Sequence, residues 1–118
     1  MVTHELPLLM VTVQEYLDAQ GRSPFAKWFE DLNAPAAAKI TTALVRIEQG
    51  NFSNTKVVGA GVFECRIDFG PGYRIYFGKD GEIIVILLGG GTKKRQNEDI
   101  QAAQRRWIDY KRRKTEEM

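Results

Sequence analysis

Two arginines on neighbouring predicted strands are the residues best suited to chemistry in this chain of 118 residues. From Phe63 to Phe69 apolar residues alternate with charged ones, and Arg66 belongs to the charged set. Arg74 lies in the next predicted strand, Tyr73 to Phe77, which a Gly70-Pro71-Gly72 turn joins to the first. Because strand side chains alternate between faces and a tight turn pairs strands antiparallel, both guanidinium groups are expected on one surface. Together they are well shaped to hold a phosphate bidentately.

Ordinary ion pairing is the alternative explanation for these two arginines. Glu64, Asp68 and Glu82 lie on or beside the same predicted strands and would form cross-strand salt bridges with them. The residue types alone leave both explanations open.

A third group of cations, Lys93-Lys94-Arg95, follows the apolar strand predicted from Ile83 to Leu88. Gly89 to Gly91 lie between them, and the sequence predicts that these glycines let the backbone leave the sheet. The cations would then project from the edge of the sheet beside the two arginines; a solvated loop is the alternative. The spacing does not fit the G-x-x-x-x-G-K-[ST] phosphate loop, so nucleotide binding is not predicted.

Several other chemistries are not supported by the composition. His4 is the only histidine and Cys65, on the predicted inward face, is the only cysteine, so no disulfide within the chain, metal site or cofactor is predicted. There is no apolar run near the ~20 residues of a membrane span and no signal-peptide pattern, which predicts a cytoplasmic protein without membrane contact. From Phe63 onward, twelve Lys and Arg face nine Asp and Glu, which indicates a polyanion or an acidic protein as partner.

The apolar periodicity predicts a single α+β domain over 1–118, in the order β-α-α-β-β-β-α. Two N-terminal helices would pack on an antiparallel β-sheet in two layers, followed by a C-terminal helix. Segment 51–61 is predicted as a loop. The other expected elements are a strand from Leu8 to Tyr16, a helix capped by Ser23-Pro24, a second helix that begins at Pro35, and a C-terminal helix from Asp99 to Lys114.

Three stretches of this sequence together resemble the RelE/ParE toxin superfamily, and most closely its HigB-like "addiction module killer protein" branch. They are Phe63-Glu64-Cys65-Arg66-Ile67, then Gly70-Pro71-Gly72-Tyr73-Arg74-Ile75-Tyr76-Phe77, then Ile84 to Gly91 followed by Lys93-Lys94. The resemblance implies a compact toxin of a type II toxin–antitoxin module. Its expected partners are a cognate antitoxin, a helix-turn-helix protein encoded next door, together with mRNA and the ribosome.

By position, the resemblance assigns the catalytic role to Arg66, Arg74, Lys93 and Lys94, with Tyr76 and Arg95 as RNA-binding residues. The implied activity is ribosome-dependent, metal-independent cleavage of mRNA, which inhibits translation. RelE-type enzymes carry a tyrosine a few residues beyond the basic pair, where this chain has Asp99 and Ile100. Two alternatives therefore stay open: a non-enzymatic, ParE-like inhibitor of DNA gyrase, and an inactive toxin relic that only binds its antitoxin.

Overall fold

The computed structural model of the protein describes residues 10–117. The elements follow the predicted order, with one additional strand and a short 3-10 turn. They are β1 (Thr12–Glu15), α1 (Pro24–Glu30), α2 (Ala34–Glu48), β2 (Thr55–Val57), β3 (Val62–Ile67), β4 (Tyr73–Asp80), β5 (Ile84–Thr92), η1 (Lys93–Arg95) and α3 (Gln96–Glu116). The predicted α+β class and element order are confirmed. Residues 8 and 9 of the predicted first strand lie outside the described residues.

The five strands form one sheet in the order β1-β5-β4-β3-β2. The three strand pairs from β5 to β2 are antiparallel, whereas β1 runs parallel to β5. The additional strand β2 lies within 51–61, where the sequence predicts a loop, and it pairs with the first half of β3. The β-branched Thr55 and Val57 favour this extended pairing.

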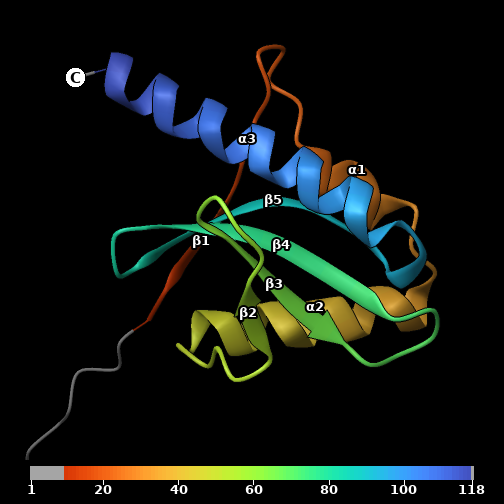
Figure 1. Ribbon diagram of the computed structural model, residues 1–118. Coiled ribbons are helices and arrows are strands. Elements are labelled where there is room, and N and C mark those ends of the chain that lie inside the picture. Colours follow the sequence, from red (N-terminus) through yellow and green to blue (C-terminus); the bar gives the residue numbers. More distant parts are fainter. Residues whose placement is uncertain (1–9, 118) are drawn as a thin grey trace, which may run out of the picture.

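Helices cover both faces of the sheet, so the fold has three layers and not the predicted two (Figure 1). On one face, α1 and α2 enclose a core that contains Phe25, Ile40 and Phe77. On the other face, α3 packs Ala103 and Trp107 over a second, smaller core. The amphipathic pattern of the last helix shows that one of its sides is buried, but it does not say which face of the sheet receives that side.

The start of α1 agrees with the predicted cap Ser23-Pro24, and α2 begins at Ala34, one residue before the predicted Pro35. The Ser23 hydroxyl accepts a hydrogen bond from the Ala26 amide at 3.0 Å, with Pro24 in the first turn. Asn33 caps α2 in the same way through the Ala36 amide at 2.9 Å. Both side chains satisfy amides that a helix N-terminus leaves without a partner.

The glycines after the apolar run stay in the sheet, because β5 continues to Thr92. The prediction that the backbone leaves the sheet there is wrong, for a packing reason. A Cβ atom at Gly90 would overlap the Trp28 ring of α1, and one at Gly91 would overlap the Asp99 carboxylate of α3. Glycine lets helices approach both faces of this strand closely. No helix within residues 10–117 combines the length and the apolar character that crossing a bilayer requires.

Candidate functional site

Arg66 and Arg74 are directly opposite each other in the register of β3 and β4, as the sequence predicts. Gly91 of β5 lies opposite Arg74 on the other side, so the three residues form one row across three strands. Neighbouring strands are ~4.8 Å apart, so the backbone that enters η1 lies about 10 Å from β3. The antiparallel pairing therefore brings the three predicted groups of cations to the same end of the sheet.

The two arginines differ sharply in their environment. Arg66 is exposed, whereas Arg74 is only 2% exposed and lies against Glu64, which is 1% exposed. The Arg74 Nε atom is 3.8 Å from Glu64 Oε2, and its Nη1 donates to the Gly72 carbonyl at 2.8 Å. The ion-pairing alternative thus holds for Arg74, and Glu64 supplies the carboxylate.

Glu64 joins three elements beneath α3. Gln96, at the start of that helix, donates from Nε2 to Glu64 Oε2 at 2.8 Å. The ammonium group of Lys56, on β2, lies 3.8 Å from Glu64 Oε1. A buried carboxylate with cations and an amide around it is far less costly than an isolated one. Glu64 therefore ties the edge of the sheet to the N-terminus of α3.

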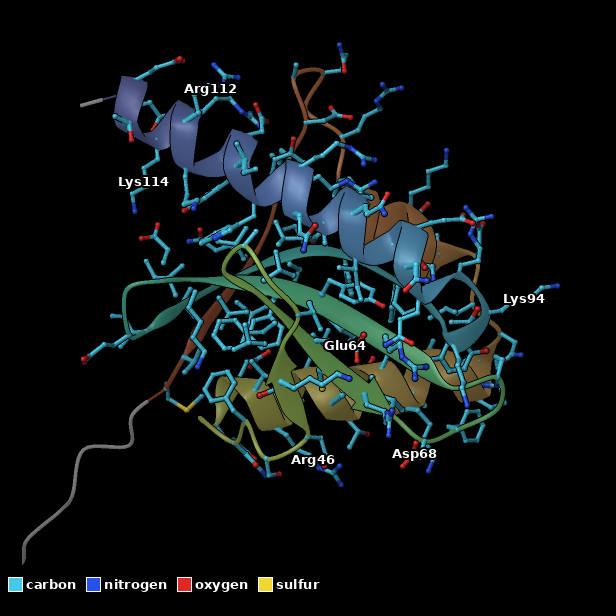
Figure 2. All side chains as sticks on the ribbon, in the orientation of Figure 1. Arg46, Glu64, Asp68, Lys94, Arg112 and Lys114 are labelled. Carbon is cyan, nitrogen blue, oxygen red and sulfur yellow. The ribbon has the colours of Figure 1, made fainter. Side chains whose placement is uncertain are left out.

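The carbonyl oxygen of Gly72 connects the buried arginine to the cationic turn η1. It accepts hydrogen bonds from Arg74 Nη1 at 2.8 Å and from the Lys93 backbone amide at 2.9 Å. Lys93, Lys94 and Arg95 are all exposed, and the Lys94 side chain points away from the body of the molecule while Glu64 lies inside (Figure 2). The turn residue thus fixes where the three cations leave the sheet.

Within residues 10–117, Arg66, Lys93 and Lys94 form no ion pair with a carboxylate, whereas Arg95 pairs with Glu98 at 2.6 Å. Three of the four predicted catalytic cations are therefore exposed and open to an anion. The fourth, Arg74, is covered.

Tyr76 is fully buried beneath α3, in the core on that face of the sheet. Burial, reinforced by the neighbouring Glu64 carboxylate, raises the pKa of the Tyr76 hydroxyl far above its usual value. A ring in this position does not reach a nucleic acid, so the predicted RNA contact through Tyr76 would require the ring to leave the core.

Asp99 lies on the first turn of α3, at the position where the resemblance leads one to expect a tyrosine. Its Oδ2 atom is buried without a hydrogen-bond partner in the described part of the chain. Burial raises the pKa of this carboxyl group, and it lies directly over Gly91. The site therefore holds a half-buried acid, with one buried oxygen, next to the row formed by Arg66, Arg74 and Gly91.

Residues 10–117 contain no group of three or more His, Cys, Asp or Glu side chains that could hold a metal ion. The Cys65 thiol is buried on the opposite face of β3, as predicted, and burial raises its pKa to about 11. A protonated, buried thiol is a poor nucleophile.

Sequence reasoning named Glu64 only as a possible salt-bridge partner of the arginines, and it did not assign Lys56, Gln96 or Asp99 to the site. Glu64 is the one with a readable signal, because it alternates with Arg66 on β3 and faces Tyr76 across the strand pair. Gln96 and Lys56 join only through tertiary packing.

The sheet, with its helices and the cationic turn after β5, has the fold of the RelE toxins. A double mutant of the E. coli toxin RelE in the free state superposes with a TM-score of 0.62 at 16% sequence identity. The match covers 82% of this chain and 97% of the RelE chain. This similarity confirms the RelE-like architecture predicted from the three sequence stretches.

Residues 27–108 match the family model described as "Phage derived protein Gp49-like (DUF891)", and the chain belongs to this family. An uncharacterized protein of Haemophilus influenzae is 45% identical over 80 residues, which cover 67% of this chain and 81% of that relative. Residues 27–108, which match the family model, contain every residue of the site described above. Membership of the HigB-like branch stays a prediction.

Proposed function

We propose that this protein is the toxin of a toxin–antitoxin pair and that it inhibits translation by cutting mRNA, without a metal ion, on the ribosome. The observation that supports the proposal is the convergence of Arg66, Lys93 and Lys94, all exposed and without carboxylate partners in residues 10–117, at one end of the sheet. Such a cluster is the electrostatic counterpart of a phosphate.

In this proposal the ribose 2′-hydroxyl attacks the adjacent phosphorus, and the bond from phosphorus to the 5′-oxygen breaks. The products are a 2′,3′-cyclic phosphate and a free 5′-hydroxyl. Arg66 and the η1 lysines stabilise the negative charge that develops on the phosphorane, as prearranged cations do. Lys93 or Lys94 acts as the general base that takes the 2′-hydroxyl proton, and the departing 5′-oxygen takes a proton from the resulting ammonium group or from water.

Arg74 has a different part in this scheme, because its guanidinium group is buried. We propose that it holds the Gly70–Gly72 turn and η1 in place through the Gly72 carbonyl, and that Arg66 contacts the phosphate directly. Alignment of the substrate by the ribosome would supply much of the rate, since orientation alone contributes ~7–11 kcal/mol in favourable cases.

Expression of Arg66→Ala and of Lys93→Ala/Lys94→Ala in cells tests the proposal, with growth and mRNA cleavage by primer extension as readouts. Loss of one charge-stabilising group is expected to lower cleavage by ~10²–10³-fold. Lys111→Ala, an exposed cation on α3, is the matched control.

Three results would count against the ribonuclease. Full cleavage by Arg66→Ala would remove the proposed site. Growth arrest with intact mRNA and gyrase-dependent DNA breaks would identify a ParE-like inhibitor. Absence of toxicity from the wild type, with binding to an adjacent helix-turn-helix protein, would indicate an inactive antitoxin-binding relic.

A further inference from the structure

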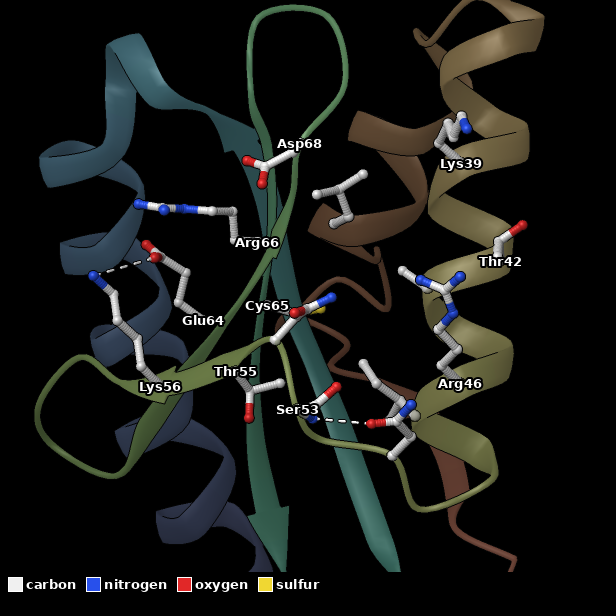
Figure 3. Close-up of a pocket in the computed structure, with 15 residues that line it drawn as sticks. Lys39, Thr42, Arg46, Ser53, Thr55, Lys56, Glu64, Cys65, Arg66 and Asp68 are labelled. Carbon is white, nitrogen blue, oxygen red and sulfur yellow. Dashed lines mark hydrogen bonds and ion pairs between the residues drawn. The ribbon is translucent and has the colours of Figure 1, made fainter.

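A second cationic feature lies at the edge of the sheet, outside the row of residues that the sequence singles out. A groove of about 600 Å³ separates α2 from the β2–β3 edge. Lys39 and Arg46 of α2 line one side of it (Figure 3), and Lys56 and Arg66 line the other. Its floor is β3, where Cys65 lies.

The charges of this groove favour an anion. Four cations line it against two acids, Asp68 and Glu64, and Glu64 is buried and paired with Arg74 and with Lys56. Lys39 and Arg46 are exposed and form no ion pair within residues 10–117. They are seven positions apart on α2, which places them on one side of the helix about 10 Å apart.

The groove is continuous with the candidate site through Arg66. The Arg66 side chain points toward the α3 face, whereas Lys39 and Arg46 approach the strand edge from the other side (Figure 3). A strand of RNA bound at Arg66 therefore reaches Lys39 and Arg46 by passing over the edge of β3 into the groove. We propose that this groove binds the single-stranded RNA next to the scissile phosphate, an inference that rests on the proposed function.

An acidic protein segment fits the groove less well. Such a segment would gain most of its affinity by pairing as an additional strand with the outer edge of β3. That edge is largely occupied, because β2 pairs with Phe63 to Cys65 and the Arg66 amide bonds to the Asn54 carbonyl at 3.1 Å. The Ile67 carbonyl accepts the Phe69 amide at 3.0 Å. Side-chain cations, and not backbone groups, are what the groove offers a ligand, which suits phosphates.

The test is binding of single-stranded 2′-O-methyl oligonucleotides, which lack the attacking hydroxyl and so stay intact. Oligonucleotides of about 4 and about 12 nucleotides are compared, because sites for single strands span ~4–16 nucleotides. Lys39→Ala/Arg46→Ala is expected to weaken binding of the long oligonucleotide and to leave the short one unchanged. Lys27→Ala/Lys111→Ala, which removes two exposed cations elsewhere, is the charge-matched control.

The dependence of oligonucleotide affinity on salt concentration gives the size of the effect expected in Lys39→Ala/Arg46→Ala. For single strands, log affinity falls against log salt with a slope of about −0.7 per phosphate contact. Loss of two contacts should make the slope less negative by about 1.4. From 50 to 200 mM salt, the long oligonucleotide should then lose about sevenfold less affinity in the variant than in the wild type.

Any other outcome would overturn the assignment of the groove, and it can be distinguished from a failure of the proposed function. If Lys39→Ala/Arg46→Ala bound the long oligonucleotide with the affinity and salt slope of the wild type, RNA binding by the groove would be excluded. Cleavage of mRNA by the wild type would still support the ribonuclease. Unchanged oligonucleotide binding with lost affinity for an acidic peptide or for the antitoxin would assign the groove to a protein. A failure of the proposed function appears instead as intact mRNA in cells that express the wild type, or as full cleavage by Arg66→Ala.

Discussion

Substitution of Glu64 by glutamine should destabilise the protein strongly, because it leaves Arg74 charged and buried. The Nε to Oε2 distance of 3.8 Å corresponds to an attraction of about 4 kcal/mol at an effective dielectric constant of about 20. Removal of one partner of a buried pair typically costs about 3–5 kcal/mol. We therefore expect Glu64→Gln to lower the free energy of unfolding by about 3–4 kcal/mol.

Urea denaturation measures this loss, with fluorescence of Trp28 and Trp107 reporting on the cores on the two faces of the sheet. The m-value should stay constant, because the surface exposed on unfolding does not change. Glu116→Gln removes a carboxylate from an exposed i,i+4 pair with Arg112 and should change stability little, which makes it the control.

A double-mutant cycle separates the pair from its surroundings. Arg74→Met alone should cost about as much as Glu64→Gln, since it leaves the carboxylate buried without its guanidinium. The combination Glu64→Gln/Arg74→Met should recover most of the loss, because neither position then carries a charge. A loss below about 1 kcal/mol in Glu64→Gln, or a double variant as unstable as the sum of the singles, would refute the reasoning.

Three further predictions follow from individual contacts. Hydrogen bonds, first from the Tyr16 hydroxyl, lower the pKa of Asp109 from 3.8 to about 2. The ionised Asp109 therefore stabilises the fold above about pH 4, and this contribution is lost as the pH falls toward about 2. In urea titrations at a series of pH values, Asp109→Asn should reduce the fall of the free energy of unfolding between about pH 4 and pH 2. Gly90→Ala places a methyl group in the Trp28 ring and should cost at least ~1–3 kcal/mol in the same assay, whereas unchanged stability would contradict the packing. Because burial raises the pKa of Cys65 to about 11, iodoacetamide at pH 8 should label the folded protein far more slowly than the protein in urea, and equal rates would show an accessible thiol.

The pairing of the arginines was predictable from the sequence because it depends on local rules. Alternation along β3 and β4, and the tight turn between them, fix both the register and the shared face of Arg66 and Arg74. The helix starts were equally predictable, because Ser23-Pro24 and Asn33 are capping signals that act on neighbouring amides.

The burial of Arg74 and Tyr76 was not predictable, because it depends on where α3 packs. The apolar side of α3 could have covered either face of the sheet, and only the tertiary fold places it over these two residues. The need for glycine in β5 also depends on how the helices pack. Their role is to admit Trp28 on one face and Asp99 on the other, which a pattern read along a single strand does not contain.

The buried ion pair of Glu64 with Arg74 determines which substitutions can separate folding from chemistry at the site. A buried ion pair is weak evidence for stability, since apolar residues of similar volume often serve as well. Here the pair lies where β2, β3, β4 and α3 meet, and the Gly72 carbonyl extends it to the turn that presents Lys93 and Lys94. Its more specific effect is to set the positions from which exposed cations act. A substitution at Arg74 therefore perturbs folding and chemistry together, whereas substitutions at the exposed Arg66 and Lys94 can separate them.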